Sequence, residues 1–221
     1  MKNETKLTQI QQEILVGSLL GDGALAKRKE NINARYHVRM GLLHKIELIY
    51  LYNIFKNLCK TSFKESNVYN KKTNKIYNVI SFMTLSYPCF NDYYNLFYNN
   101  GKKSIPLNIA ELLTARGLAQ WIMDDGGRDG NGLRLYTNSF TKKDLELLQQ
   151  ALKKNFDLNA NIIHVNKKIN SSQFKLYIKV ESMIKLKLLV KPFMLPSMYY
   201  KIQLTSPNNI NKNSYNNNNL R

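Results

Sequence analysis

The sequence has few of the residues that build structural metal sites or membrane spans. Its 221 residues include only two cysteines, Cys59 and Cys89, without Cys-x-x-Cys spacing, and three histidines, none of them at metal-ligand spacing. A structural zinc site is therefore excluded, and we expect two free, buried thiols. No apolar run reaches the roughly 18 residues that a membrane span needs, and the N-terminal MKNETKLTQI lacks the apolar stretch of a signal peptide. We expect a soluble, uncleaved protein.

Acidic residues are also scarce, with 15 Asp and Glu against 33 Lys and Arg and a formal net charge of +18. Residues 1–110 and residues 111–221 each carry a net charge of +9, so neither half accounts for the excess alone. Such a charge attracts phosphate backbones in a salt-dependent way. A peripheral membrane protein would need a long basic amphipathic helix with one apolar face, and the sequence has none. We therefore expect a nucleic-acid partner and no membrane.

Alanine is rare, at 8 residues, whereas asparagine occurs 29 times, and this bias is typical of AT-rich codons. It indicates an organellar gene, and we expect a mitochondrial protein, with the chloroplast in second place. The last stretch, 206–221, is almost free of apolar residues, and we expect it to be disordered. The rest of the chain is long enough for one large domain or for two of about 100 residues each.

Two nine-residue segments stand out, LVGSLLGDG at 15–23 and LAQWIMDDG at 118–126. In each, an apolar stretch with helical character runs into an aspartate followed by glycine: Asp22 in the first and Asp125, 103 residues later, in the second. The last turn of a helix carries partial negative charge and favours cations over anions. Two carboxylates in that position therefore suggest a metal ion between them. The alternative is that Gly-Asp-Gly is only a turn signal and Asp-Asp-Gly only a helix stop.

The two halves of the chain show the same order of elements. Thr8 and Gln11 form a capping box at the start of a helix that the glycines at 21 and 23 end. The apolar spacing then predicts, in the first half, a strand at 34–42, a helix at 44–58 with Ile46, Ile49, Tyr50 and Leu58 among its apolar positions, a strand at 76–85 and a helix at 90–100. In the second half it predicts a helix at 115–123, a strand at 132–138, a helix at 142–155, strands at 160–166 and 173–180, and a helix at 181–191.

This order predicts an α+β fold in which helices cover one face of an antiparallel sheet in each half and leave the other face free for a ligand. Polar or basic residues alternate along the strands as such a face requires; they are Arg35, His37 and Arg39, then Arg134 and Tyr136, and later Lys175, Tyr177 and Lys179. An ordinary solvated face would show the same alternation. The net charge favours a face that binds DNA.

The two segments resemble the paired LAGLIDADG motifs of homing endonucleases, in the single-chain, intron-encoded form whose two repeats imitate a homodimer. The matching residues are Leu15, Gly17, Asp22 and Gly23 in the first segment and Leu118, Ala119, Ile122, Asp125 and Gly126 in the second. The segments depart from the motif where Leu20 and Met123 replace its inner aspartate and where Gln120-Trp121 replaces its Gly-Leu. The resemblance covers about residues 8–203, as repeats at 1–105 and 106–205.

The resemblance implies two pseudo-symmetric αββαββα repeats with saddle-shaped antiparallel sheets for DNA and with the motif helices at the interface. Asp22 and Asp125 would then be catalytic and would bind Mg²⁺, or Mn²⁺, which prefers oxygen ligands. The metal would support phosphodiester hydrolysis in both strands. A basic residue in each half commonly assists, and Lys103 and Lys201 fit, 81 and 76 residues after their aspartates. Both could equally be solvated surface lysines.

The resemblance leaves a rival function open. Some members of the fold are RNA maturases that help a group I intron to splice, with or without endonuclease activity, and a DNA-binding regulator without catalysis is a third interpretation. The aspartates in both repeats favour the nuclease over the regulator but separate nuclease from maturase less well. Because one chain already holds two repeats, we expect a monomer that binds double-stranded DNA.

Overall fold

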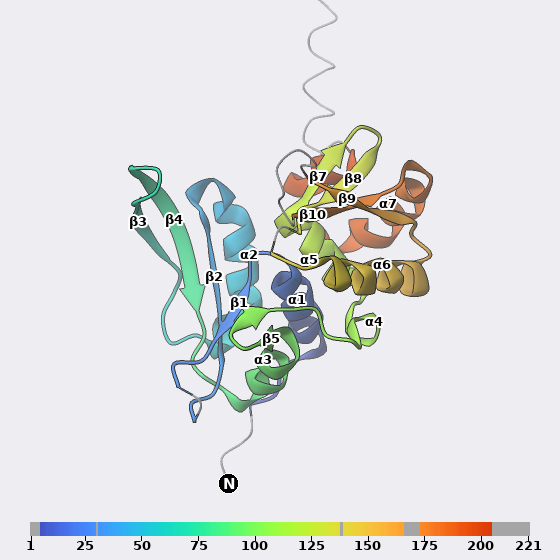
Figure 1. The fold of residues 1–221 in the computed structure, drawn as a ribbon. Helices are drawn as coiled ribbons and strands as arrows, with labels where there is room; N and C mark the ends of the chain where they lie inside the picture. Colours follow the sequence, from blue (N-terminus) through green and yellow to red (C-terminus); the bar gives the residue numbers. More distant parts are fainter. Residues whose placement is uncertain (1–4, 30, 138, 166–172, 205–221) are drawn as a thin grey trace, which may run out of the picture. The chain divides into compact units, whose positions relative to one another are not determined.

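The computed structural model describes residues 5–29, 31–137, 139–165 and 173–204 (Figure 1). The chain divides into two compact units, Met1–Pro106 and Leu107–Arg221. The expected disordered tail, 206–221, lies outside the described residues. In the part that is described, no helix combines the length and the apolar character needed to cross a membrane.

The first unit is a four-stranded antiparallel sheet with helices on one face. Its elements are α1 (Gln9–Leu20), β1 (Ala24–Ala26), β2 (Arg35–Gly41), α2 (Lys45–Phe55), β3 (Lys64–Asn70), β4 (Lys75–Met83), α3 (Asn91–Phe97), β5 (Tyr98–Asn99) and β6 (Lys102–Lys103). The strand order is β1-β2-β4-β3, and β5 and β6 form a separate two-stranded ribbon. Helix α2 contacts β2 and β4, the central strands (Figure 1).

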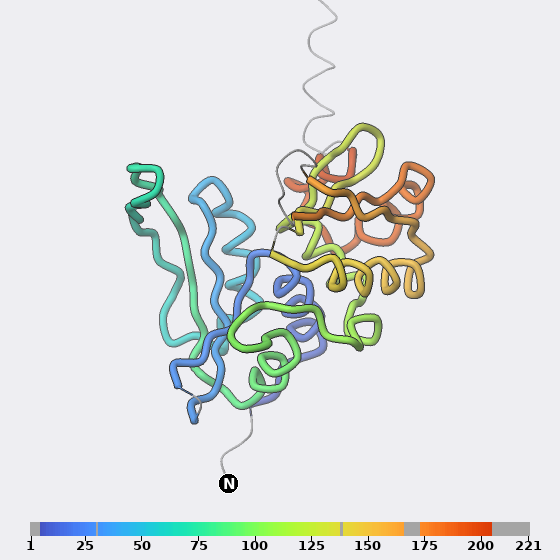
Figure 2. Tube along the Cα trace, viewed as in Figure 1, coloured from blue at the N-terminus to red at the C-terminus, as the bar shows by residue number. Residues whose placement is uncertain are grey.

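The second unit repeats this plan. Its elements are α4 (Ile109–Leu112), α5 (Ala115–Asp125), β7 (Gly126–Asp129), β8 (Gly132–Leu135), α6 (Lys142–Phe156), β9 (Ala160–His164), β10 (Phe174–Ile178) and α7 (Met183–Val190). The strand order, β7-β8-β10-β9, matches that of the first unit, and α6 covers β9 and β10 as α2 covers its own sheet (Figure 2). Both units follow the order αββαββα, so the predicted α+β fold with two repeats is confirmed.

Edge strands account for most differences from the sequence prediction. β1, β3 and β7 were not predicted, and the strand expected at 132–138 ends at Leu135. β3 is exposed along most of its length and β7 starts at two glycines, so neither shows the apolar alternation that marks a half-buried strand. Backbone pairing with β4 and β8 forms these strands instead.

The start and end of α1 follow the sequence prediction. Thr8 Oγ1 accepts from the Gln11 amide at 3.2 Å and Gln11 Oε1 accepts from the Thr8 amide at 3.0 Å, which completes the capping box. The helix ends at Gly21, the residue before Asp22. Gln11 is buried and also donates through Nε2 to Ile54 O at 2.8 Å, which ties α1 to α2. The capping residue therefore helps to fix the helix that carries the first motif.

The predicted apolar face of α2 was partly wrong. Leu48, Leu51 and Phe55 are fully buried, whereas Ile46 is 61% exposed. The buried residues lie at i, i+3 and i+7 and face the sheet, where Phe55 contacts the Tyr36 ring at 4.8 Å between centroids. Ile46 lies in the first turn, outside this stripe.

Both cysteines are free, as predicted, but half-buried rather than buried. Burial alone raises the pKa of Cys59 to about 11, so its thiol stays protonated near neutral pH.

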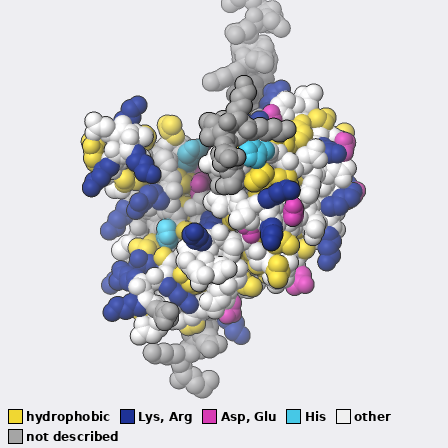
Figure 3. Space-filling view, in the orientation of Figure 1, with side chains coloured by type: hydrophobic (Ala, Val, Ile, Leu, Met, Phe, Trp, Pro, Cys, Tyr) yellow, Lys and Arg dark blue, Asp and Glu magenta, His cyan; other side chains and the backbone are white. Residues whose placement is uncertain are grey.

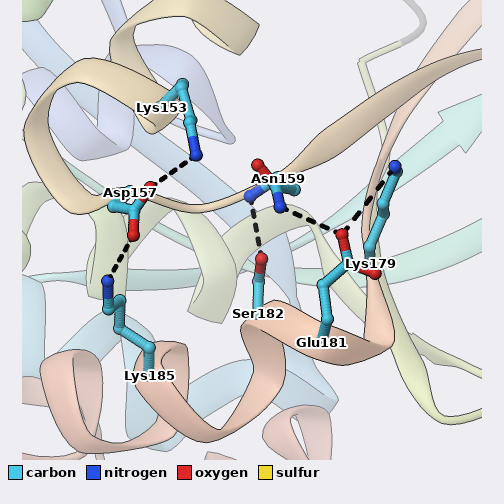
Figure 4. Close-up of polar contacts among 7 residues, drawn as sticks. All are labelled: Lys153, Asp157, Asn159, Lys179, Glu181, Ser182 and Lys185. Atoms are coloured by element: carbon cyan, nitrogen blue, oxygen red, sulfur yellow. Dashed lines mark hydrogen bonds and ion pairs between the residues drawn. The ribbon is translucent and has the colours of Figure 1, made fainter.

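A polar cluster joins α6, β9 and α7 on the helical side of the second unit (Figure 4). Asp157 follows α6 in the left-handed conformation and pairs with Lys153 at 2.5 Å and Lys185 at 2.7 Å. Ser182 Oγ accepts from the Asn159 amide at 2.8 Å. The cluster closes the helix end and links it to α7.

Replacing Asp157 with asparagine is expected to lower stability at pH 5, and by only about half as much at pH 3. The hydrogen bonds from Lys153 and Lys185 lower the pKa of Asp157 to about 2, from 3.8. The charged form is therefore favoured in the folded state; its contribution is present above the unfolded pKa and is lost as pH falls toward 2. Asparagine tolerates the left-handed backbone and removes only the charge. Urea midpoints at pH 5 and pH 3 measure this, with Glu146→Gln as the charge-matched control, and an unchanged difference between mutant and wild type would contradict it.

Candidate active site and nucleic-acid interface

The first motif aspartate lies at the junction of a helix and an edge strand. Asp22 follows the Gly21 cap of α1 and precedes β1, and the amides of Gly21 and Gly23 both donate to Ser18 O, at 3.0 and 2.8 Å. A Cβ on Gly23 would lie 2.2 Å from Ser18 Oγ and 2.9 Å from Tyr36 Cε2. Glycine is therefore required after the aspartate, because only a bare backbone passes this close to the helix.

The second motif aspartate lies at the equivalent junction of the second unit. Asp125 is the last residue of α5, Gly126 begins β7, and the Gly126 amide donates to Ile122 O. A Cβ on Gly126 would lie 2.4 Å from that carbonyl oxygen. The Asp125 carbonyl accepts from the Tyr136 amide at 3.0 Å. The Asp-Gly dipeptide thus lies at the passage from the motif helix to the edge strand in both units.

Each junction also holds a lysine from the far end of its own unit. Lys103 Nζ donates to Gly21 O at 3.0 Å and to Gly23 O at 2.8 Å, on either side of Asp22. Lys201 Nζ donates to Met123 O and, at 3.2 Å, to Asp124 O, immediately before Asp125. The last carbonyls of a helix lack backbone partners and attract cations. Lys201 is only 6% exposed and Lys103 is half-buried, so neither is a solvated surface lysine.

The open face of the first sheet lies where the alternation on β2 predicts it. Tyr36, Val38 and Met40 are buried, while Arg35, His37 and Arg39 point to the opposite face. These three side chains, together with Lys64, Ser81 and Met83 on the neighbouring strands, line a hollow of about 360 Å³. Lys and Arg side chains gather over the strands of this unit (Figure 3). Burial, and then the charges of Arg35, Arg39 and Lys103, lower the pKa of His37, so its imidazole is neutral near pH 7.

The open face of the second sheet follows the same alternation. Leu133 and Leu135 are buried on β8, and Arg134 and Tyr136 take the other face. Arg134 Nε donates to Asp129 Oδ2 at 2.9 Å, and this bond raises the pKa of the guanidinium. On β10, Lys175 and Tyr177 alternate with buried neighbours, and Tyr177 pairs directly with Arg134. The side chains of this face thus form one continuous row across two strands.

Lys179 lies apart from this row. It follows the end of β10, lies 3.8 Å from Glu181 through Nζ, and borders a hollow that Gln149 and Lys153 of α6 also line. Lys179 therefore lies beside the helical layer. The row of side chains on the open face ends at Tyr177 and does not include Lys179, contrary to the sequence prediction.

Register shows that His37 and Arg134 occupy equivalent positions. Ala24 and Gly127 each lie two residues after the motif aspartate, and they pair with His37 and Arg134 respectively. In each unit, a histidine or arginine on the second strand therefore pairs with the edge-strand residue two positions after the motif aspartate. This equivalence was not visible in the sequence, because β1 and β7 were not predicted.

The described geometry agrees with comparisons to known proteins. A family model described as the LAGLIDADG DNA endonuclease family matches residues 12–186. The chain belongs to this LAGLIDADG family.

Relatives of this LAGLIDADG protein carry two kinds of name. "Cytochrome b mRNA maturase bI2" of Debaryomyces hansenii is 36% identical over 193 residues, which cover 86% of this chain and 72% of the relative. "Intron-encoded endonuclease ai4" of Dictyostelium discoideum is 35% identical over 159 residues, which cover 70% of this chain and 98% of the relative. A solved structure, "The homing endonuclease I-WcaI bound to its DNA recognition sequence", matches with a TM-score of 0.80 and 28% identity, over 91% of this chain and 88% of that one.

The motif aspartates of this LAGLIDADG protein are oxygen donors of the kind that a divalent cation prefers. Among the described residues, no group of three or more His, Cys, Asp or Glu side chains gathers at one point. Mg²⁺ is commonly held by one or two carboxylates, with waters and substrate phosphates completing its shell. Each motif supplies one such carboxylate, Asp22 in the first unit and Asp125 in the second.

Two residues of the LAGLIDADG segments were seen in the sequence only as departures from the motif. Gln120 is 2% exposed and donates through Nε2 to Asp124 Oδ1 at 2.7 Å. Trp121 beside it is fully buried. A polar pair at i and i+4 inside an apolar helix is the signal that could have predicted this contact.

Proposed function

We propose that this LAGLIDADG protein is a site-specific, metal-dependent DNA endonuclease that hydrolyses one phosphodiester bond in each strand of its target. One observation carries the proposal: both units place an aspartate where a motif helix meets an edge strand, and both hold a lysine on the adjoining carbonyls. A regulator that only binds DNA would need neither group. The presence of the full set in both repeats therefore favours a nuclease that cuts two strands.

The chemistry divides between the carboxylates and the lysines. Asp22 and Asp125 would hold Mg²⁺ or Mn²⁺, which when bound activates a water and stabilises the charge of phosphodiester hydrolysis. Lys103 and Lys201 fix the backbone that carries each aspartate, and their ammonium groups add positive charge where the phosphate becomes more negative.

The open faces would bind the duplex and read its sequence. A two-stranded ribbon of β-structure fits the DNA major groove, where all four base pairs are distinguishable. Arginine is suited to guanine edges, and neutral His37 and Tyr136 can exchange hydrogen bonds with bases. We assign DNA contacts to the side chains on the open faces, namely Arg35, His37 and Arg39 in the first unit and Arg134, Tyr136 and Lys175 in the second.

Alanine at Arg35, Arg39 or Arg134 is expected to weaken binding to the cognate duplex by about 1 to 3 kcal/mol each, and to relax sequence preference near the lost contact. Arg134→Ala also leaves Asp129 without the bond that Arg134 Nε donates, so we expect its effect to be the largest. Titration of labelled duplexes in Ca²⁺ measures both quantities.

Lys71 and Lys72, which lie in the turn between β3 and β4, are the matched controls. Their alanine variants should lose affinity equally for all sequences and lower the salt slope by about one. Normal binding of the cognate duplex by all three arginine variants, with only intron splicing responding to the protein, would contradict the assignment.

The second candidate is an RNA maturase for a group I intron, with or without cleavage activity. The 36% identity to a protein named as a cytochrome b mRNA maturase supports it. That relative and the asparagine-rich composition also support a mitochondrial, intron-encoded protein. Affinity for the folded intron RNA above that for the intronless DNA site would favour this candidate.

We expect a monomer in solution, because one chain supplies two aspartates, two lysines and two open sheet faces. Sedimentation should give a single species near the chain mass of 25.7 kDa. A stable dimer would contradict this expectation.

A further inference from the structure

The two motif helices differ at two positions that lie four residues apart. When Asp22 is aligned with Asp125, the residues five and one before the aspartate are Gly17 and Gly21 in the first unit, but Gln120 and Asp124 in the second. The first unit thus has no side chain at either position. The second unit has a side-chain amide at one position and a carboxylate at the other.

In the second unit these two side chains are joined. Residues i and i+4 lie on the same side of a helix, and Gln120 Nε2 donates to Asp124 Oδ1 at 2.7 Å. Gln120 is 2% exposed, so water does not compete for this bond. Within the part of the chain that the structure describes, its buried Oε1 has no hydrogen-bond partner. An unsatisfied buried acceptor is unfavourable, so the amide is not explained by packing, which leucine would serve better.

The backbone of the same residue is held as well. Lys201 Nζ donates to Asp124 O at 3.2 Å and also to Met123 O. Residue 124 is therefore fixed through both its side chain and its carbonyl, and Asp125 follows directly. In the first unit, Lys103 fixes Gly21 O, but residue 21 has no side chain to hold.

We propose that Asp124, held by Gln120, is a positioning residue for Asp125 and acts only in the half-site of the second unit. This inference rests on the proposed endonuclease function. Asp124 places a second carboxylate beside Asp125 and so strengthens the local attraction for a divalent cation. Gln120 fixes the last turn of α5 and so holds the direction of Asp125. The two half-sites are therefore unequal, and the two DNA strands are cut with different metal requirements.

The test uses the full-length protein and a supercoiled plasmid that carries the intronless host-gene junction, with the nicking rate of each strand measured across a Mg²⁺ titration. The strand that Lys201→Met slows is taken as the one cut by the second unit. Asp124→Asn keeps the shape and removes the charge; we expect that strand to be cut about tenfold more slowly at limiting Mg²⁺ and at near wild-type rate at saturating Mg²⁺. The other strand should keep its rate.

Gln120→Leu tests the hydrogen bond from Gln120 separately from the charge of Asp124. It keeps the Asp124 carboxylate but removes the hydrogen bond that Gln120 donates to it, so the same strand should lose about tenfold in rate even at saturating Mg²⁺. Glu146→Gln, which removes an exposed carboxylate on α6, is the control and should leave both strands unchanged.

Three results would overturn the inference: equal slowing of both strands in Asp124→Asn, a Mg²⁺ requirement that the variant leaves unchanged, or a large fall in its melting temperature that accounts for the slower cut. Wild-type protein that nicks neither strand in Mg²⁺ would instead contradict the proposed function, and the inference would fall with it.

Discussion

Asp22→Asn and Asp125→Asn are each expected to abolish double-strand cleavage, a loss of more than about 10³-fold, as expected when a group that stabilises the transition state is removed. Each change removes the motif carboxylate that would hold the divalent cation in its own unit. DNA binding should survive, because phosphate contacts from the basic strands supply most of the affinity. Plasmid cleavage in Mg²⁺ and duplex binding in Ca²⁺ measure the two effects separately.

Asp92→Asn is the matched control for the aspartate variants, since Asp92 is an exposed carboxylate on α3. It should cleave and bind as the wild type does. Retained cutting by both Asp22→Asn and Asp125→Asn would show that the motif carboxylates are not the catalytic ones.

The second large effect is expected at the two lysines. Lys103→Met and Lys201→Met should each lower the cleavage rate by about 10²- to 10³-fold, the range for removing one charge-stabilising donor. They should differ in stability. Lys201 is buried and holds two carbonyls, so Lys201→Met should also cost about 1 to 3 kcal/mol of unfolding free energy. Lys103 is half-buried, so water can replace part of its bonding and the cost should be smaller.

Lys102→Met and Lys191→Met are the controls, because both side chains are exposed and Lys102 is adjacent to Lys103 on β6. Cleavage rates in single turnover and urea unfolding give the two readouts. If Lys103→Met and Lys201→Met cleave as fast as these controls, the lysines only cap the helix ends.

The sequence predicted the features that depend on local patterns. The capping box at Thr8, the end of α1 at Gly21 and the alternation of Arg35, His37 and Arg39 are all readable from neighbouring residues, and the structure confirms them. The edge strand β7 was missed because its order comes from pairing with β8, not from apolar alternation.

The site was predicted less completely than the fold. Lys103 and Lys201 were chosen by resemblance to a family, and their contacts with the backbone around each aspartate depend on segments about 80 residues apart in the chain. The contact between Gln120 and Asp124 is local, but it contradicts the motif and was noted only as a departure. Lys179 fitted the alternation of β10, yet the strand ends before it at Ile178.

The most direct test of the central claim compares wild-type protein on two supercoiled plasmids, one with the intronless host-gene junction and one with the junction interrupted by the intron. We expect the protein to linearise only the intronless plasmid, in Mg²⁺ and not in EDTA, with one break in each strand at a fixed position. Cleavage of neither plasmid, together with protein-dependent splicing of the intron RNA, would contradict the central claim.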